Sequence, residues 1–262
     1  MLRGWRGLRL GLHILQGALT IALLYRFCTE RQQDRLRQRW SRRLLTILGI
    51  ELSHDGLPQP GALLVANHVS WLDIYVINAV APSAFVSKAE VRGWPLIGWL
   101  AARNSTIFLR RGSRGHARIV NQEIDQVLAM GRNVAVFPEG TTTDGSQVLH
   151  FHAALLQPAV SAGRPVQALA ISYLDGEGHP TAAPAYDGDL SLGGCLANIL
   201  AHRRLAARLC AAAPMETTAR HRRDLAETAR ADIIRMAGLS APPATEPATA
   251  AEAPGAAAAA QP

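Results

Sequence analysis

Three acid–base side chains stand directly after apolar runs that are typical of buried strands. His68 and Asp73 lie in "NHVSWLD" (67–73), and Glu139 lies in "FPEG" (137–140). A carboxylate that accepts a hydrogen bond from one imidazole nitrogen fixes the tautomer, and the other nitrogen can then take a proton. The first cluster is therefore compatible with a general base, His68, oriented by Asp73.

The same stretch also has a purely structural interpretation. Ser70 followed three residues later by Asp73 is a capping-box pattern, which predicts Ser70 as the N-cap of a helix that begins at Trp71. An acid at the third helical position points back toward the helix start, where His68 lies. Capping and catalysis are compatible, and the spacing alone does not choose between them.

The second and third clusters also leave alternatives open. Glu139 and Gly140 could be a turn, but a buried carboxylate needs a partner or a ligand hydroxyl, and the glycine would let backbone amides approach a reacting carbonyl. Lys88 is the only lysine. Lys88 and Arg111 each follow a predicted strand, where they are either solvated surface residues or a phosphate clamp.

The elements that must position these residues alternate between strands and helices. Short apolar runs predict strands at 61–67, 83–88, 104–111, 133–140 and 165–173, with a further strand at 202–210. Helices are predicted at 71–80, 115–131, 152–163 and 218–238. This order predicts an α/β fold with a largely parallel mixed sheet covered by helices, whose active site lies outside the carboxyl ends of the strands.

The positive charge of the chain is concentrated at its N-terminus. The net charge is +7 over 262 residues, but residues 1–50 hold ten arginines against two acidic residues, and the remainder is close to neutral. This distribution favours an anionic membrane surface as the partner, and no nucleic-acid motif is present. Three scattered cysteines, Cys28, Cys195 and Cys210, indicate a reducing compartment and no disulfide framework.

The ends of the chain differ from its middle. The apolar run 8–25 is interrupted by His13 and Gln16 and lacks a following cleavage site, which predicts a half-inserted interfacial helix, with a tilted crossing as the alternative. The basic amphipathic segment 34–50 is expected at the membrane surface, although it could pack on the protein body. We therefore predict membrane-associated helices over 1–50, a catalytic domain over 51–239, and a disordered tail over 240–262.

The three clusters in this order resemble those of the lysophosphatidic acid acyltransferase family of glycerolipid acyltransferases. The resemblance covers roughly residues 60–175 and rests on NHxxxxD, an arginine motif in "FLRR", and FPEG about 70 residues after the first. It implies that His68 is the general base and Asp73 its orienter. Arg111, and more weakly Lys88, would bind the acceptor phosphate, Glu139 would bind the acceptor glycerol, and the backbone at Gly140 would steady the oxyanion.

The implied reaction moves a fatty acyl group from acyl-CoA or acyl carrier protein to the hydroxyl of a lysophospholipid, without a cofactor or metal. The expected acceptor is 1-acyl-glycerol-3-phosphate, which gives phosphatidic acid, at the cytoplasmic face of the inner membrane. "FPEGTTTDG" lacks the arginine of the commoner "FPEGTRS", and Ala168 replaces a usual proline. Other acceptors, lyso-ornithine lipid or lysophosphatidylcholine, therefore stay open. A lipid or thioester hydrolase, without a GxSxG elbow, and a non-enzymatic membrane protein are the remaining alternatives.

Overall fold

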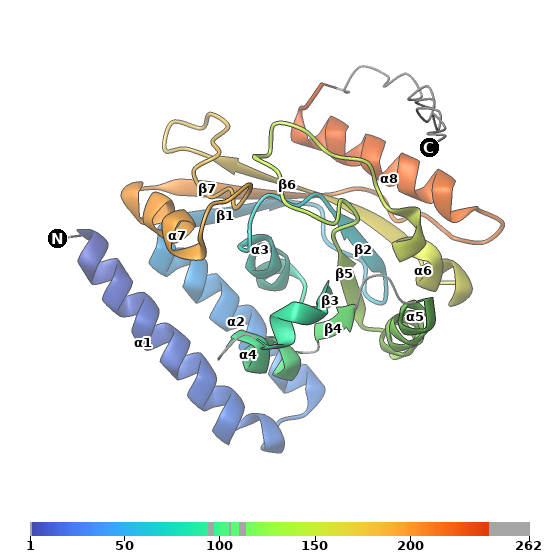
Figure 1. Ribbon diagram of the computed structural model, residues 1–262, viewed down its shortest axis with the longest axis horizontal. Helices are drawn as coiled ribbons and strands as arrows, with labels where there is room; N and C mark the ends of the chain where they lie inside the picture. The colour runs from blue at the N-terminus through green and yellow to red at the C-terminus, as the bar shows by residue number, and fades with distance from the viewer. Residues whose placement is uncertain (1, 94–96, 105, 110–113, 241–262) are drawn as a thin grey trace, which may run out of the picture.

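Apolar runs of four to nine residues form most strands of a single sheet. The computed structural model describes residues 2–93, 97–104, 106–109 and 114–240. Within them seven strands lie in the order β1-β7-β6-β2-β5-β3-β4 (Figure 1). Only β6 and β7 pair antiparallel, so the predicted largely parallel mixed sheet is confirmed. The strands are β1 (Ile50–Asp55), β2 (Leu63–Ala66), β3 (Ser83–Lys88), β4 (Thr106–Leu109), β5 (Asn133–Val136), β6 (Val166–Leu174) and β7 (Leu205–Ala211).

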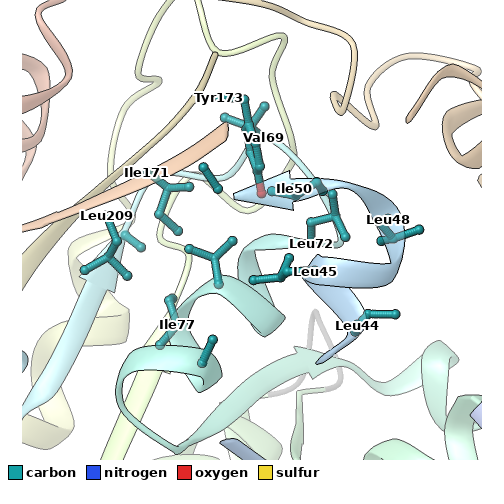
Figure 2. Close-up of a cluster of buried hydrophobic side chains, with 14 of the residues drawn as sticks. Leu44, Leu45, Leu48, Ile50, Val69, Leu72, Ile77, Ile171, Tyr173 and Leu209 are labelled. Carbon is teal, nitrogen blue, oxygen red and sulfur yellow. The ribbon is translucent and has the colours of Figure 1, made fainter. Parts of the chain in front are cut away.

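Helices cover both faces of this sheet, as the alternation of side chains in β2 shows. Leu64 and Ala66 pack in one hydrophobic cluster, and Leu63 and Val65 pack in the other. The first cluster holds side chains of α2 (Glu30–Leu48), α3 (Asp73–Val80) and α7 (Leu192–Ala201), and part of it is drawn in Figure 2. The second holds those of α5 (Arg114–Ala129), η3 (Ala153–Leu156), α6 (Gln157–Ser161) and α8 (Arg222–Ala237). Two short elements, η2 (Ala89–Gly93) and α4 (Ile97–Arg103), lie between β3 and β4.

Helix α2 belongs to the protein core. It begins with a capping box between Thr29 and Gln32 and ends at Gly49, which has a φ of 75°. Its leucines Leu44, Leu45 and Leu48 are fully buried against the sheet and α3. The expectation that the apolar face of this segment meets the membrane is therefore wrong. It failed because an amphipathic pattern does not say which apolar surface the helix covers.

Helix α1 (Leu2–Leu23) packs against α2 and is connected to it by η1 (Tyr25–Phe27). The side chains of His13 and Trp40 join the two helices. His13 Nε2 donates to the Trp40 carbonyl at 3.0 Å, and Trp40 Nε1 donates to the His13 carbonyl at 3.1 Å. The two rings also stack with their centroids 4.5 Å apart. His13 and Gln16, which interrupt the apolar run in the sequence, thus have different surroundings, since Gln16 stays exposed and bonds to Thr20 within α1.

The opposite face of α1 is an exposed apolar stripe. Six of its large side chains are between 49% and 58% exposed and recur every three or four residues: Trp5, Leu8, Leu12, Leu15, Leu19 and Leu23. Among the described helices, none has an apolar stretch that could cross a bilayer.

Several boundaries differ from those that the sequence predicts. β1 was not expected, because it is an edge strand in which only Ile50 is buried. α7 was also not expected, and α3 begins at Asp73, two residues later than predicted. The strand and closing helix expected near 202–210 and 218–238 are present as β7 and α8. The predicted tail at 240–262 lies, from residue 241 on, outside the described residues.

Candidate active site

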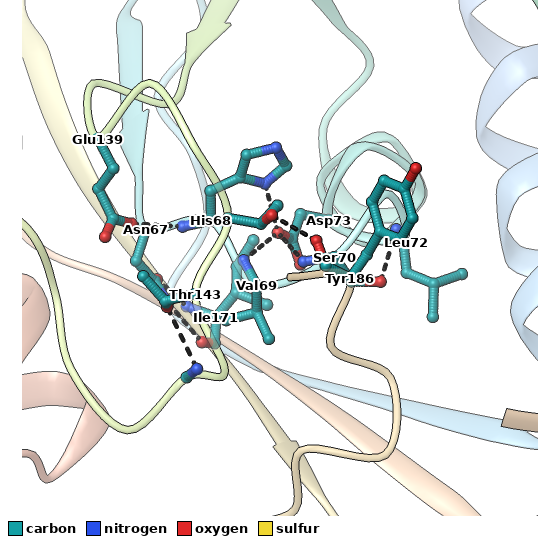
Figure 3. A network of polar contacts seen from close by, with 12 residues as sticks. Asn67, His68, Val69, Ser70, Leu72, Asp73, Glu139, Thr143, Ile171 and Tyr186 are labelled. Carbon is teal, nitrogen blue, oxygen red and sulfur yellow. Dashed lines mark hydrogen bonds and ion pairs between the residues drawn. The ribbon is translucent and has the colours of Figure 1, made fainter. Parts of the chain in front are cut away.

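The first and second clusters meet at the carboxyl ends of two adjacent parallel strands. β2 and β5 pair in parallel, and the chain reaches His68 two residues after the end of β2 and Glu139 three residues after the end of β5. The main-chain N–H of His68 donates to Glu139 Oε1 at 2.7 Å (Figure 3). The structure therefore brings His68, Asp73 and Glu139 together, as the rule for strand ends in α/β sheets predicts.

His68 and Asp73 form a direct hydrogen-bonded pair. His68 Nδ1 lies 2.8 Å from Asp73 Oδ2. Because an ionised carboxylate can only accept, Nδ1 carries the proton and Nε2 presents a lone pair. Within the described part of the chain Nε2 has no hydrogen-bond partner, and the His68 side chain is 21% exposed. This arrangement suits a base that takes a proton from a ligand.

The turn that carries this pair keeps part of the predicted capping pattern. Asp73 Oδ2 also accepts the main-chain N–H groups of Val69 at 2.8 Å and Ser70 at 2.9 Å. The Ser70 hydroxyl accepts from the main-chain N–H of Leu72, but Leu72 occupies the N-cap position because the helix begins at Asp73. Ser70 is therefore not the N-cap, and only one of the two reciprocal bonds of the pattern is present, from the Ser70 N–H to the Asp73 carboxylate. The bonds from Val69 and Ser70 place the Asp73 carboxylate beside the imidazole.

The carboxylate of the dyad is shielded from solvent. Asp73 is fully buried, and Tyr173 of β6 donates to its Oδ1 at 2.7 Å. The His68 ring stacks on Phe137 with centroids 4.0 Å apart and planes 13° apart. Phe137, the first residue of FPEG, thus supports one face of the imidazole, so the second motif positions His68 through both Phe137 and Glu139.

Glu139 ties two segments together with its two oxygens. Oε1 accepts from the His68 N–H, and Oε2 accepts from the Leu149 N–H at 2.8 Å. The residue is 5% exposed. Burial raises the pKa of this carboxyl group, and the hydrogen bonds from Leu149 and His68 partly oppose the rise. The N–H of Gly140 donates to the Phe137 carbonyl in a tight turn, where Gly140 has a φ of 72°, so this amide is engaged within the motif.

Other segments hold the main chain on both sides of His68. The Thr143 N–H donates to the His68 carbonyl and the Tyr186 N–H donates to the Val69 carbonyl, each at 2.9 Å. The Thr142 hydroxyl donates to the Tyr186 carbonyl and links these two loops (Figure 3 labels Thr143 and Tyr186). The sequence did not single these residues out, because backbone-mediated contacts leave no pattern of residue types.

The predicted phosphate ligands are only partly described. β3 lies next to β5, and β4 next to β3, so their carboxyl ends lie at the same edge as His68. Lys88 is the last residue of β3, but its side chain lies outside the described residues, as does the whole of Arg111.

Ser70 is a poor candidate for nucleophilic chemistry at this site. Ser70, the nucleophile that a hydrolase would need, is fully buried in the turn. Among the described residues no group of three or more His, Cys, Asp or Glu side chains is arranged to hold a metal ion.

Comparisons with known proteins find matches among acyltransferases. A family model described as Acyltransferase matches residues 46–172. The chain is 42% identical over 216 residues to the lyso-ornithine lipid O-acyltransferase of Pseudomonas aeruginosa, a match that covers 81% of this chain and 83% of that enzyme. It is 40% identical over 163 residues to the 1-acyl-sn-glycerol-3-phosphate acyltransferase of Neisseria meningitidis serogroup B, a match that covers 62% of this chain and 64% of that enzyme.

A solved structure shares the fold. The crystal structure of the 1-acyl-sn-glycerophosphate acyltransferase of Thermotoga maritima superposes with a TM-score of 0.67 at 24% identity, and covers 90% of this chain and 96% of that one.

Proposed function

Since this chain belongs to the lysophosphatidic acid acyltransferase family of glycerolipid acyltransferases, we propose that His68 and Asp73 catalyse acyl transfer from a thioester to the hydroxyl of a lysolipid. The observation that carries this assignment is the 2.8 Å contact between His68 Nδ1 and Asp73 Oδ2, which leaves Nε2 as the basic nitrogen. The thioester is that of coenzyme A or acyl carrier protein.

The chemistry follows from that tautomer. His68 Nε2 takes the proton of the acceptor hydroxyl while the oxygen attacks the thioester carbonyl, and the new C–O bond gives a tetrahedral oxyanion. The oxyanion collapses, the C–S bond breaks, and the leaving thiolate recovers the proton from the imidazolium. Asp73 stabilises the imidazolium that forms between these steps. No acyl-enzyme is needed, which agrees with the burial of Ser70.

We propose 1-acyl-glycerol-3-phosphate as the acceptor and phosphatidic acid as the product. Lys88 is the last residue of β3, and Arg111 comes two residues after β4 in the sequence. The carboxyl ends of both strands share the edge of the sheet with His68, which suits an acceptor phosphate. Glu139 would contact the acceptor glycerol in addition to the two N–H groups that it already accepts.

Lyso-ornithine lipid is the second candidate acceptor. Two observations favour it: "FPEGTTTDG" lacks an arginine after FPEG, and the enzyme of P. aeruginosa that matches this chain over 83% of its length acts, by its name, on lyso-ornithine lipid. That acceptor carries no phosphate, so it would depend less on Lys88 and Arg111.

We propose that the chain works at the cytoplasmic face of the inner membrane, with α1 lying along the lipid surface. The exposed stripe from Trp5 to Leu23 offers the apolar contact. The arginines of residues 1–50 add attraction to anionic lipid of about 1 kcal/mol for each one near the surface. The membrane-associated region would thus be α1 and not the whole of residues 1–50, because α2 packs in the core, and residues 51–239 would carry the catalytic residues.

A labelled acyl thioester given to membranes that carry the protein tests the reaction and the acceptor together. With lysophosphatidic acid we expect labelled phosphatidic acid, and His68→Ala should abolish its formation in a protein that still unfolds cooperatively. Labelled ornithine lipid, formed from lyso-ornithine lipid at a higher kcat/KM, would select the second acceptor. Free fatty acid as the sole product, or full activity of His68→Ala, would contradict the proposal.

A further inference from the structure

The side chain of Tyr173 touches the His68–Asp73 dyad from the far side of the carboxylate. Its hydroxyl donates to Asp73 Oδ1 at 2.7 Å, while His68, Val69 and Ser70 all bond to Oδ2. Tyr173 is 4% exposed, and Asp73 has no exposed surface. Figure 2 shows the Tyr173 ring beside Val69 with its hydroxyl oxygen pointing into the apolar cluster.

We propose that Tyr173 is a positioning residue for acyl transfer, which keeps the buried Asp73 carboxylate ionised and aimed at His68. The inference rests on the proposed function, because it takes His68 as the base and Asp73 as its orienter. Tyr173, Asp73 and His68 then form a chain of hydrogen bonds that runs from β6 to the reacting proton.

The need for this hydroxyl follows from the cost of burying a charge. A carboxylate removed from water is destabilised unless donors replace the water on both oxygens. Among the hydrogen bonds that the described residues make to the Asp73 carboxylate, three serve Oδ2 and only the phenol serves Oδ1. Without it, Oδ1 would be buried with no donor from a side chain, and the carboxylate would bind a proton more readily.

The phenol is suited to remain a donor. Burial, and then the negative charge of Asp73, raise the pKa of Tyr173 well above its ordinary value of 10.0. Tyr173 therefore stays protonated, and remains a donor to Asp73, throughout the neutral pH range.

The strand that carries Tyr173 is itself fixed to the start of the catalytic turn. The Asn67 side chain donates to the Ile171 carbonyl at 3.0 Å and accepts from the Ile171 N–H at 2.8 Å. Ile171 and Tyr173 are two residues apart and point to the same face of β6. One strand thus holds both Asn67, which precedes the base, and Asp73, which orients it.

Tyr173→Phe tests the proposal, because it removes the hydroxyl and keeps the ring. We expect kcat to fall roughly tenfold, equivalent to one hydrogen bond, with little change in KM. We also expect the acid limb of the pH profile of kcat/KM to move to higher pH. A carboxylate without its Oδ1 donor is easier to protonate, and while ionised it holds a proton on His68 more tightly, so both effects act in the same direction.

Other titratable groups near the dyad are Glu139, from the loop after β5, and Cys195 of α7, which faces Tyr173. Both are retained in the variant, so they do not account for a shift. Tyr75→Phe is the matched control. Tyr75 is two residues from Asp73, burial also raises its pKa, and within the described part of the chain its hydroxyl makes no hydrogen bond to the dyad. Its pH profile should equal that of the wild type.

The Asp73→Asn background separates positioning from packing. There, Tyr173→Phe should lower kcat no further, because the residue through which it acts is already changed. An unshifted acid limb in Tyr173→Phe, or equal losses in both backgrounds, overturns the inference. If His68→Ala is inactive but the acid limb of Tyr173→Phe does not shift, this inference alone is rejected. If His68→Ala is active, the proposed function is rejected.

Replacement of tyrosine by 3-fluorotyrosine covers the case in which Tyr173→Phe does not fold. The fluorinated phenol is a stronger donor, so the acid limb of a Tyr186→Phe protein should move to lower pH. The Tyr186 change removes the tyrosine whose main chain bonds to Val69, and the Tyr75→Phe control accounts for the tyrosine beside Asp73. An unmoved limb in this protein also overturns the inference.

Discussion

The main-chain N–H of His68 donates a 2.7 Å hydrogen bond to Glu139 Oε1, so the two polar motifs, 71 residues apart in the chain, are joined at His68. The other oxygen of Glu139 accepts the N–H of Leu149 at 2.8 Å. Each oxygen thus holds a different segment. The carboxylate fixes the position of the His68 backbone, and the Phe137 ring, two residues earlier, fixes the plane of its imidazole.

Glu139→Gln should lower activity without unfolding the protein. An amide offers one acceptor oxygen where two N–H groups need acceptors, so either His68 or Leu149 loses its partner. We expect kcat to fall by about one to two orders of magnitude, as 1–3 kcal/mol of lost positioning predicts. Steady-state kinetics measure this loss, and Glu123→Gln, on the exposed side of α5, is the control. A wild-type kcat in Glu139→Gln would contradict the proposal that the two hydrogen bonds of Glu139 position His68.

Arg230 of α8 holds the segment whose Leu149 N–H donates to Glu139. Its Nε donates to the Leu149 carbonyl at 2.8 Å and its Nη2 donates to the Val148 carbonyl at 2.6 Å. Arg230→Met keeps the apolar stem but releases this segment, whose N–H at Leu149 holds Glu139. We expect the free energy of unfolding to fall by about 1–3 kcal/mol, and kcat to fall several-fold.

Denaturant unfolding and kinetics of the same preparations measure both effects of Arg230→Met. The matched control is Arg235→Met on the same helix, where the arginine is 70% exposed and pairs with Asp232. An exposed pair contributes at most about 1 kcal/mol, and Arg235 does not contact the segment. Equal kcat values for the two variants would show that Arg230 contributes to stability alone.

The sequence predicted the catalytic end of the fold better than its edges. Strands β2 and β5 are buried on both faces, so their apolar runs were visible, and parallel pairing placed His68 and Glu139 together. β1 was missed because an edge strand with one buried residue has no apolar run. The apolar face of α2 was assigned to the membrane because periodicity gives the width of a face and not its partner.

Residues that act through long-range contacts could not be predicted. Tyr173 lies 100 residues from Asp73, and in the sequence it is one more apolar residue of a buried strand. Arg230 appears as part of a polar helix surface, and its bonds to Val148 and Leu149 depend on how α8 packs. Only the folded chain shows that these side chains support the two motifs.

Protonation of His13 should loosen the contact between α1 and α2. Burial lowers the pKa of His13 from 6.5, the bond to the Trp40 carbonyl opposes this, and the charge of Arg43 lowers it further. Because the folded pKa is depressed, the unfolded chain binds the proton first as the pH falls. The stability that neutral His13 provides is therefore present above pH 6.5 and is lost as the pH falls toward the folded pKa.

Unfolding free energies measured between pH 8 and pH 5 check the effect of His13. His13→Asn should be less stable than the wild type at pH 8, and the difference between the two proteins should shrink as the pH falls through 6.5. The control His54→Asn changes an exposed histidine of β1 and should follow the wild-type profile. A difference between His13→Asn and wild type that is constant with pH would contradict the role of protonation.

Acidic substitutions in the exposed stripe of α1 should release the protein from lipid. Leu12 and Leu19 are 58% and 49% exposed and lie two turns apart on the same face. Burial of each leucine in lipid contributes about 1.5–3 kcal/mol, so the pair Leu12→Glu and Leu19→Glu should weaken binding to vesicles of phosphatidylglycerol and phosphatidylcholine at least a hundredfold. Co-sedimentation with the vesicles measures the binding.

The control Leu57→Glu changes a residue that is 67% exposed but lies outside α1, and it should bind as the wild type does. If the stripe only attaches the enzyme, turnover of a water-soluble short-chain acceptor stays the same in all three proteins. Wild-type binding by the double variant would show that lipid meets another face of the molecule.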